Sequence, residues 1–316
     1  MNLTPIAFFV YNRPFHVRKS IESLIKNDLA SESDIFIFSD APKINSNMNE
    51  VEQVREYIKT ISGFKNMEII EREKNLGLAN SIINGVTYVI NKYGKVIVIE
   101  DDLLCLNNFL RFMNDALEFY ADKKKVFSVT GYNYPKKLMK IPRNYNYDVY
   151  FCPRCSSWGW GTWKDRWEKA DWEFKDAGIF LKDKKLQKAY SGSGEDKVDM
   201  VIAQIEGKID SWATRWEYTH FKNNAYAVYP VKSFLNNIGF DGTGVNSGYD
   251  KKYFYANGLE DLKYDVIFLN DIKLNKEIMI EFRKIFKKDK LYNLKKFIKK
   301  IIFYDKWNKK NKEISC

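Results

Sequence analysis

The sequence predicts an α/β fold with a mostly parallel central sheet. Short apolar segments typical of strands alternate with segments whose apolar residues recur every three or four positions, as on one face of a helix. Over the first 100 residues the order is strand–helix, repeated three times and closed by a fourth strand. Such an order gives parallel strands joined by right-handed crossovers. Polar residues follow each predicted strand directly, at the sheet edge where ligands bind in open α/β folds.

The fourth predicted strand is the clearest, because residues 96–99 are an unbroken β-branched run, typical of a strand buried on both faces. In the first helix, Val17, Ile21, Leu24 and Ile25 share one face. The strands are expected at residues 5–11, 34–40, 67–71 and 95–99, and the helices between them near 17–25, 51–61 and 79–91.

The chain changes character after a fifth strand, expected at residues 126–130 behind a helix over 107–122. Residues 132–150 are rich in Tyr, Pro and Asn, and seven of the eight tryptophans lie between Trp158 and Trp216. We therefore expect three parts: a first half over residues 1–130, a second half with a different task over 131–270, and a tail over 271–316.

Composition indicates a globular protein with a large core, because 45% of the residues are hydrophobic and 16% are aromatic. No apolar run reaches the length of a membrane-spanning helix, and residues 1–5 lack the basic start of a signal peptide. The expected compartment is therefore the cytoplasm. Among four cysteines, Cys152 and Cys155 form a single CxxC pair, which favours ordinary reduced cysteines over a zinc or redox site.

The basic charge belongs to the tail. Residues 276–312 carry 14 Lys or Arg and 4 acids, which accounts for +10 of the net charge of +11. A nearly neutral body argues against a nucleic-acid partner. In the tail, apolar residues from Leu291 to Ile302 fall on one helical stripe, and Lys295, Lys296, Lys299 and Lys300 sit between them. This pattern predicts a basic amphipathic helix on an anionic membrane surface; the alternative is that the stripe packs on the body.

Three carboxylates, Glu100, Asp101 and Asp102, directly follow the fourth strand. A buried strand cannot hold three unpaired charges, so the cluster is expected where the strand leaves the sheet. Carboxylates there are good ligands for a hard cation such as Mn²⁺ or Mg²⁺, which in turn binds phosphate oxygens. The alternative is a solvated turn or a helix N-terminus.

Several motifs together resemble a known family. They are Val10-Tyr11-Asn12-Arg13, Ser39-Asp40, Asn75-Leu76-Gly77-Leu78-Ala79, Glu100-Asp101-Asp102 and, downstream, residues 157–163 with the sequence SWGWGTW. In this order they resemble bacterial glycosyltransferases of the GT-A fold, a Rossmann-like architecture. Within that fold the chain is most similar to the N-acetylglucosaminyltransferase-I-like branch. The resemblance covers roughly residues 5–250.

The resemblance implies roles on the donor side. The first half would bind a nucleotide-sugar, and Asp102 would bind the metal. The residues implied in donor binding are Tyr11, Arg13 and Asp40 for the base and diphosphate, Asn75, Gly77 and Asn80 in the same pocket, and Glu100 and Asp101 toward the sugar and ribose. Two of them have simpler alternatives: Arg13 as a plain surface arginine, and Asp40 as the cap of the turn at Pro42.

The second half would bind the acceptor. Trp158 and Trp160 are the candidate acceptor contacts, although tryptophans more often belong to the core. Asp210 matches the position of the catalytic base, with Glu195 and Asp196 as competitors. One departure concerns the glycine-rich stretch at 240–248, because Asn246 stands where similar sequences carry a histidine. The tail would be the basic amphipathic part.

The expected function is an inverting, metal-dependent transfer of a sugar from a nucleotide-sugar, most simply a UDP-sugar. The acceptor would be a glycan or lipid-linked glycan of a bacterial surface polysaccharide, reached at the inner face of the membrane. Two alternatives stay open at this point. A sugar nucleotidyltransferase would carry a glycine-rich loop after the first strand, where residues 12–14 are Asn-Arg-Pro instead. The other is a non-catalytic carbohydrate- or nucleic-acid-binding protein.

Overall fold

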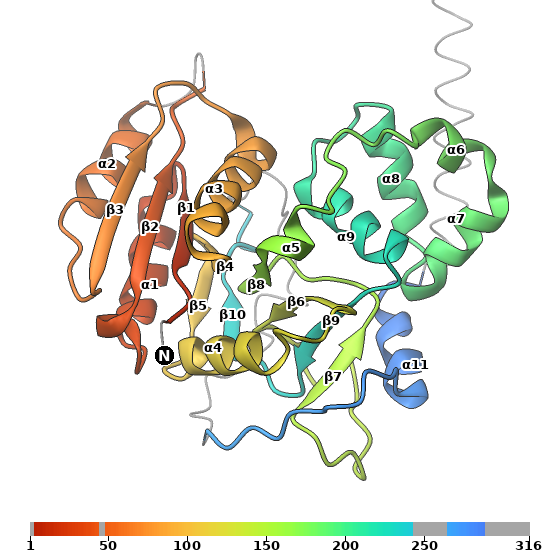
Figure 1. Ribbon diagram of the computed structural model, residues 1–316. Helices are drawn as coiled ribbons and strands as arrows, with labels where there is room; N and C mark the ends of the chain where they lie inside the picture. The colour runs from red at the N-terminus through yellow and green to blue at the C-terminus, as the bar shows by residue number, and fades with distance from the viewer. Residues whose placement is uncertain (1–2, 44–47, 243–263, 288–316) are drawn as a thin grey trace, which may run out of the picture.

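The computed structural model describes residues 3–43, 48–242 and 264–287. Within these residues eight strands form one twisted sheet in the order β3-β2-β1-β4-β8-β6-β9-β7, with helices on both faces (Figure 1). The alternation of strands and helices that the sequence predicts for the first half is confirmed, and the fold is the expected α/β architecture with a large, mostly parallel central sheet.

The first half is a parallel block. The strands β1 (Ile6–Val10), β2 (Asp34–Ser39), β3 (Asn66–Glu71) and β4 (Lys95–Glu100) are joined by helices α1 (Pro14–Ile25), α2 (Met48–Ile58) and α3 (Gly77–Tyr93). The chain moves outward from β1 through β2 to β3, and then returns to place β4 on the other side of β1. The order therefore reverses between β1 and β4, and in open α/β sheets ligands bind in the crevice at the carboxyl ends of the strands at such a point.

Alternate residues of the buried strands face different helices. Ile6 and Phe8 of β1 pack with α1, α2 and α4 (Phe109–Phe119), whereas Ala7 and Phe9 pack with α3. Both faces of β1 and β4 are thus covered, which explains why residues 96–99 are uniformly apolar.

The second half extends the same sheet. It adds β6 (Val126–Thr130), β7 (Val149–Cys152), β8 (Trp160–Trp163) and β9 (Tyr226–Pro230). The tryptophan-rich motif was not predicted as a strand, yet β8 lies antiparallel between β4 and β6. The sheet and its two main core clusters are continuous across residue 130, so no separate hydrophobic core begins there.

A lobe of short helices stands beside this part of the sheet (Figure 1). Phe174, Phe180, Tyr190, Val201 and Tyr218 form its own small core. The helices are α5 (Lys164–Trp167), α6 (Ala177–Lys182), α7 (Lys184–Tyr190), α8 (Lys197–Ile205) and α9 (Trp212–Lys222). Short 3₁₀ turns are η1 (Ala30–Glu32) and η2 (Ser191–Ser193).

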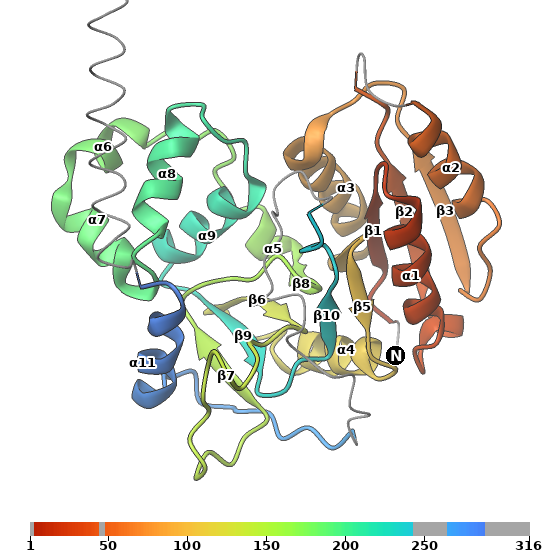
Figure 2. The same ribbon diagram turned by 180° about the vertical axis from the view of Figure 1, so that it is seen from behind.

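A short antiparallel ribbon connects the two halves. The strand β5 (Leu103–Cys105) pairs with β10 (Leu235–Asn237), and Figure 2 shows the two side by side. Because β5 begins one residue after Asp102, this pairing carries residues 238–242 past the acidic cluster.

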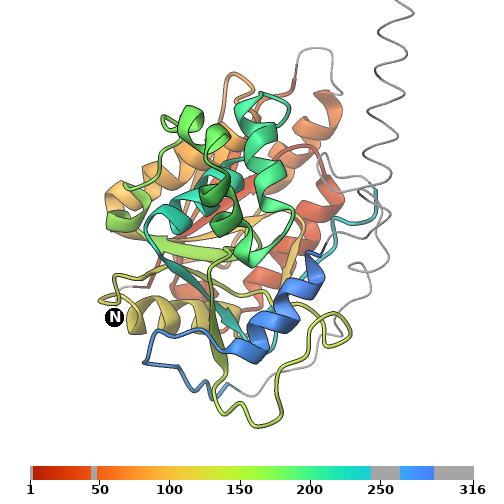
Figure 3. The ribbon, with the colours of Figure 1, turned by 90° about the vertical axis from the view of Figure 1, so that its right-hand side faces the viewer.

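The helix α11 (Lys276–Ile285) packs against the body and lies beside the helical lobe (Figure 3). Ile278 and Phe282 are fully buried in the core that α3 and α9 share. The expected tail over 271–316 therefore begins with a helix of the folded body. The amphipathic stripe from Leu291 to Ile302 and Asn246 lie outside the described residues. In the part of the chain that the structure describes, no helix is both long and apolar enough to span a membrane.

Candidate active site

The acidic cluster lies where the sequence predicts it, at the carboxyl end of β4. Phe9 of β1 pairs with Glu100, and Val10 pairs with Ser39 of β2. The residues that follow these three strands therefore emerge at one edge of the sheet. Residues 101 and 102 form a turn in which Asp101 is buried and Asp102 is partly exposed.

Arg13 joins the end of β1 to this turn. Its Nη2 donates to a carboxylate oxygen of Asp101 and to Asp102 Oδ2, 3.0 Å away. Its Nη1 is buried and has no hydrogen-bond partner among the described residues. Arg13 is thus more than a surface arginine, because it is held at the crevice with one donor group still unused.

The site holds more negative charge than Arg13 can balance. Burial and the neighbouring Asp102 and Asp101 raise the pKa of Glu100 well above the ordinary carboxyl range. Burial also raises the pKa of Asp101, although Arg13 opposes that rise. Three clustered oxygen-bearing side chains that resist carrying their charges together suit a hard divalent cation, which would relieve the repulsion. The carboxyl groups present are therefore suitable in kind for a divalent cation, although their present arrangement, with Arg13 bound to two of them, is not that of a metal centre.

The chain after β10 forms a wall of the same site, and this wall was not predicted. The Ile238 amide donates to the Asp102 carbonyl at 2.9 Å. Gly239 lies so close that a Cβ there would overlap the Asp102 carboxylate. Asp241 Oδ2 lies 3.1 Å from His16 Nε2 on α1. The glycine-rich character of residues 240–248 was the one signal in the sequence that pointed to this segment.

Asp40, Asn75 and Gly77 also come together, at the carboxyl end of β2. The Asp40 carboxylate accepts hydrogen bonds from the backbone amides of Leu76 and Gly77, at 3.0 and 3.1 Å, and from that of Ala41 at 2.9 Å. Asn75 Nδ2 donates to the Ala41 carbonyl at 2.6 Å. Asp40 therefore fixes the loop that begins α3, a wider task than capping the turn at Pro42.

Two further donor candidates lie near this loop. The hydroxyl of Tyr11, which directly follows β1, accepts from the Lys43 amide at 3.1 Å. Asn80 lies in the first turn of α3, and its Nδ2 donates to the Leu76 carbonyl at 3.2 Å. Gly77 adopts a φ of +73°, a conformation that favours glycine and lets the chain turn into α3.

The two tryptophans expected at the acceptor have different environments. Trp158 is partly exposed, and its ring contacts Tyr132 and Phe240 edge-on, at centroid distances of 4.4 and 5.5 Å. Trp160 in β8 is 0% exposed and stacks on Trp212 at 5.0 Å. Trp160 is a core residue and has no surface to offer an acceptor, because β8 is covered on both faces.

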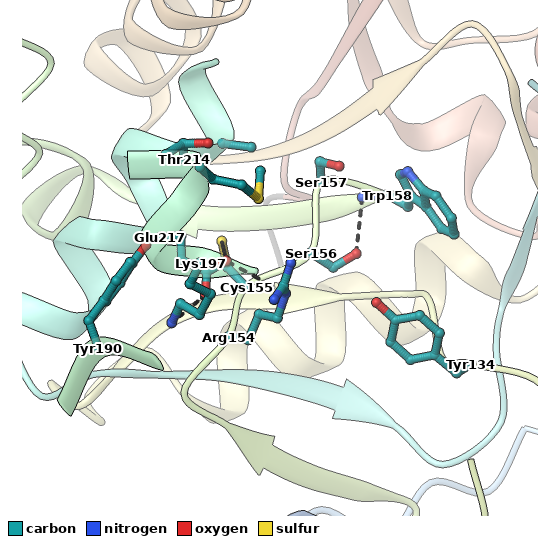
Figure 4. A pocket seen from close by; sticks show the side chains of 12 residues that line it. Tyr134, Arg154, Cys155, Ser156, Ser157, Trp158, Tyr190, Lys197, Thr214 and Glu217 are labelled. Carbon is teal, nitrogen blue, oxygen red and sulfur yellow. Dashed lines mark hydrogen bonds and ion pairs between the residues drawn. The ribbon is translucent and has the colours of Figure 1, made fainter. Parts of the chain in front are cut away.

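A cavity of about 190 Å³ opens in the second half (Figure 4). Figure 4 shows Trp158 and Tyr134 toward one end, with Glu217 and Tyr190 toward the other. The lining also includes Arg154, Cys155, Ser156, Ser157, Lys197, Met200, Ala213 and Thr214. Trp158 also contacts Phe240, which directly follows the segment at Ile238 and Gly239 that contacts Asp102. The side chain of Trp158 therefore connects the cavity with the acidic turn.

Charged pairs form a wall of this cavity. Arg154 donates to both carboxylate oxygens of Asp196 at 2.8 Å, and its guanidinium lies over the Phe286 ring, 3.7 Å from the centroid. Lys197 Nζ lies 2.7 Å from Glu217 Oε1 and donates to Ser193 Oγ at 2.8 Å. Sequence reasoning missed Arg154, Lys197 and Glu217, because their pairing joins positions far apart in the chain.

The candidate bases occupy different places. The side chain of Asp210 is 57% exposed, is paired with Arg215 and does not line the cavity. Glu195 is exposed at the start of α8, and Asp196 is held by Arg154. The structure thus brings neither Asp210 nor Glu195 to the cavity, whereas Glu217 lies on it.

The cysteines lie apart from any cation site. Cys105, Cys152 and Cys155 are buried free thiols, and burial raises the pKa of Cys152 to about 12. Among the described residues no group of three or more His, Cys, Asp or Glu side chains has the arrangement of a ready metal centre. Cation binding at the acidic turn would therefore need the Arg13 pair to rearrange.

A family comparison identifies the class of protein to which this fold and acidic turn belong. The family model described as glycosyl transferase family 2 matches residues 6–178. The chain belongs to glycosyltransferase family 2. Membership favours a glycosyltransferase among the alternatives that the sequence leaves open.

Solved structures are also similar, at low identity. One is the mannosyltransferase PcManGT from Pyrobaculum calidifontis in complex with GDP-Man and Mn²⁺, with 14% identity and a TM-score of 0.36 over 52% of this chain and 46% of that one. S. aureus TarS has 12% identity and a TM-score of 0.39 over 74% of this chain and 36% of that one. A structure of TarS residues 1–349 has 13% identity and a TM-score of 0.38 over 74% of this chain and 59% of that one. The chain thus spans less than two thirds of each. Comparison with curated proteins gave no match.

Proposed function

We propose that the protein is an inverting, metal-dependent glycosyltransferase that moves a sugar from a UDP-sugar to a glycan acceptor. The observation that carries this proposal is the acidic turn at the crevice between β1 and β4, where Glu100, Asp101 and Asp102 exceed the charge of Arg13. Such an imbalance favours a divalent cation together with a diphosphate, because each balances the other's charge.

The metal, Mn²⁺ or Mg²⁺, would be held by Asp102, with Asp101 beside it. When bound, it supplies charge stabilisation to the leaving diphosphate. Arg13 contributes from the other side of the crevice. Its buried Nη1 lacks a partner and is suited to donate to a diphosphate oxygen.

The remaining donor contacts follow from position. Tyr11 and Asp40 lie at the ends of β1 and β2, and Asn75, Gly77 and Asn80 lie where α3 begins. The Asp40 hydrogen bonds with the Leu76 and Gly77 amides hold this loop in place without a donor. Glu100 and Asp101 complete the pocket toward the ribose and sugar.

Inversion requires a base on the face of the sugar opposite the leaving diphosphate. The acceptor oxygen forms a bond to the anomeric carbon as the bond to the diphosphate breaks, and the hydroxyl proton passes to a carboxylate. We keep Asp210 in this role, with Glu195 and Asp196 as competitors. Its exposure leaves the carboxylate accessible, but it must leave Arg215 to act, and the reacting hydroxyl must meet it outside the cavity, which Asp210 does not line.

The proposed roles divide along the chain into the two halves of the sheet and the tail. Residues 1–130 serve the donor, residues 131–270 serve the acceptor, and the tail binds an anionic membrane surface at its inner face. A lipid-linked glycan of a bacterial surface polysaccharide suits such a placement, as does membership of the N-acetylglucosaminyltransferase-I-like branch, which the ordered motifs support.

Nucleotide binding tests the proposal. The melting temperature of the full chain is measured with UDP, GDP, CDP and dTDP, each with Mn²⁺ or with EDTA. A ligand that binds only the native state raises the melting temperature. We expect UDP with Mn²⁺ to give the largest shift and EDTA to abolish it. Proton NMR of the product from the matching UDP-sugar should show the inverted anomer. A retained anomer, or no shift with any nucleotide, contradicts the proposal.

A further inference from the structure

The cavity beside Trp158 has the features of a built ligand site. The side chain of Glu217 is only 10% exposed, yet it lines the cavity. Its Oε1 is paired with Lys197 Nζ, 2.7 Å away. A carboxylate oxygen has two lone pairs, so Oε1 can still accept a hydrogen bond from a ligand hydroxyl.

The cations of this cavity are already committed. Both terminal nitrogens of Arg154 donate to Asp196, and its Nε faces Glu217 at 3.9 Å. Lys197 is shared between Ser193 and Glu217. Two cations and two carboxylates balance, so the wall presents no net positive charge to an anionic ligand.

The rest of the lining is mixed. Trp158 and Tyr134 supply partly exposed aromatic surface, while Ser156, Ser157 and Thr214 add hydroxyl groups. An aromatic face beside a buried carboxylate and several hydroxyls suits a ring that has apolar C–H faces and a polar rim. The volume of about 190 Å³ is small, on the scale of one such ring.

We propose that this cavity binds the terminal sugar of the acceptor, and that it selects a neutral sugar over an acidic one. Glu217 accepts a hydrogen bond from a ring hydroxyl, and Trp158 packs against the ring. The proposal rests on the proposed function, since it assigns the acceptor of that reaction. The sugar would contact Trp158, which in turn contacts Phe240 beside the segment at Ile238 that is hydrogen-bonded to Asp102.

Binding without donor tests the site directly. Saturation-transfer NMR on the full chain follows methyl glycosides of neutral hexoses and N-acetylhexosamines, and of glucuronic acid as the acidic counterpart. At least one neutral glycoside should bind at least tenfold more tightly than the uronide. Glu217→Gln should weaken the neutral glycoside roughly tenfold, because a hydrogen bond to a charged group is replaced by one to a neutral group.

Two further variants make the result specific. Ala213→Leu adds bulk at a lining position that is not part of the charged pairs and should also abolish binding, which covers the case in which Glu217→Gln unfolds. Glu206→Gln is the matched control, because Glu206 is an exposed glutamate of the same lobe, and it should bind as the unmodified chain does. Binding that survives Ala213→Leu, or a uronide that binds as well as the neutral glycosides, overturns the proposal, as does no binding of any neutral glycoside.

The nucleotide experiment separates the two proposals. If UDP and Mn²⁺ bind but no neutral glycoside does, the cavity assignment fails and the proposed function stands. If a neutral glycoside binds and responds to both variants while no nucleotide binds, the cavity assignment stands as a sugar site and the donor proposal fails.

Discussion

Arg13 Nη2 donates a hydrogen bond to Asp102 Oδ2 across the crevice between β1 and β4, at 3.0 Å. This hydrogen bond ties Asp102, the proposed metal ligand after β4, to Arg13, which follows β1. Any cation that binds Asp102 must displace or share this guanidinium. The donor site is therefore a set of competing charges, and the first two predictions concern how that competition is resolved.

Removal of the metal should stop the reaction. With EDTA, sugar transfer should fall to background, and Mn²⁺ or Mg²⁺ should restore it. Asp102→Ala should lose activity while its melting temperature stays near that of the unmodified chain, since Asp102 is partly exposed. Transfer assays and thermal unfolding of both proteins measure this. Full turnover in EDTA would contradict metal dependence but not the fold.

Gly239 should be intolerant of a side chain for a reason local to Asp102. In Gly239→Ala the new Cβ would overlap the Asp102 carboxylate and push it aside. We expect Mn²⁺ affinity and kcat to fall at least tenfold. Gly178→Ala is the matched control, because no atom lies within 4 Å of a Cβ at that position. Calorimetric Mn²⁺ titration of both variants decides the matter, and equal affinities would show that the carboxylate has room to move.

Asp210→Asn tests the base. The amide keeps the size of the side chain but cannot take a proton, so kcat should fall by roughly 10²–10⁴-fold with UDP affinity nearly unchanged. Glu195→Gln and Asp196→Asn are compared in the same assay. If the rate survives in Asp210→Asn and collapses in Glu195→Gln, the base lies at the start of α8. A loss of donor binding in Asp210→Asn would instead mark Asp210 as a binding or structural residue.

His220 should make the protein less stable in acid. Burial lowers its pKa from 6.5 to about 4, against a hydrogen bond with the Trp216 carbonyl that favours the charged form. Between these values the unfolded chain binds a proton that the folded chain does not, so stability falls as the pH drops from 6.5 toward 4. At about 1.4 kcal/mol per pKa unit, the loss is ~3 kcal/mol. Urea unfolding from pH 7.5 to 4.5 should show a flatter curve for His220→Gln; parallel curves would contradict this.

The basic tail should control membrane binding. Changing Lys295, Lys296, Lys299 and Lys300 to Gln in the full chain removes cations worth roughly 1 kcal/mol each near an anionic surface. Flotation with phosphatidylserine vesicles should then be lost. The control changes Lys184, Lys185 and Lys188, which are exposed on α7, and should float normally. Equal flotation of all three proteins would mean that the tail packs on the body or is not involved.

The parts of the fold and site that were predictable are those written in local pattern. A β-branched run such as residues 96–99 has to lie inside the sheet, so the acids after it have to emerge at an edge. The alternation of strands and helices before residue 96 makes the neighbouring strands parallel, so the residues that follow those strands emerge at the same edge. Arg13 and Asp40 lie at this edge for the same reason, since Asp40 directly follows β2 and Arg13 comes three residues after the end of β1.

The rest depends on contacts between distant segments. The pairing of β5 with β10 brings Gly239 to Asp102 across more than a hundred residues, and no periodicity reports such a pairing. Trp160 belongs to the core because β8 inserts between β4 and β6, whereas Trp158, two residues earlier, precedes the strand. Glu217 reads in sequence as one polar residue of α9, and only the fold places Arg154 and Lys197 beside it.

The contact between Phe286 and Arg154 joins the C-terminal end of α11 to a wall of the proposed acceptor cavity. The tail continues directly from this point. If the tail binds a membrane, lipid-linked acceptors in that membrane meet the cavity as tethered partners, at an effective concentration set by tail length and surface density rather than by bulk amount. Even an acceptor with weak intrinsic affinity would then saturate the enzyme. Dilution of the vesicles at constant lipid composition should leave the rate per bound enzyme unchanged.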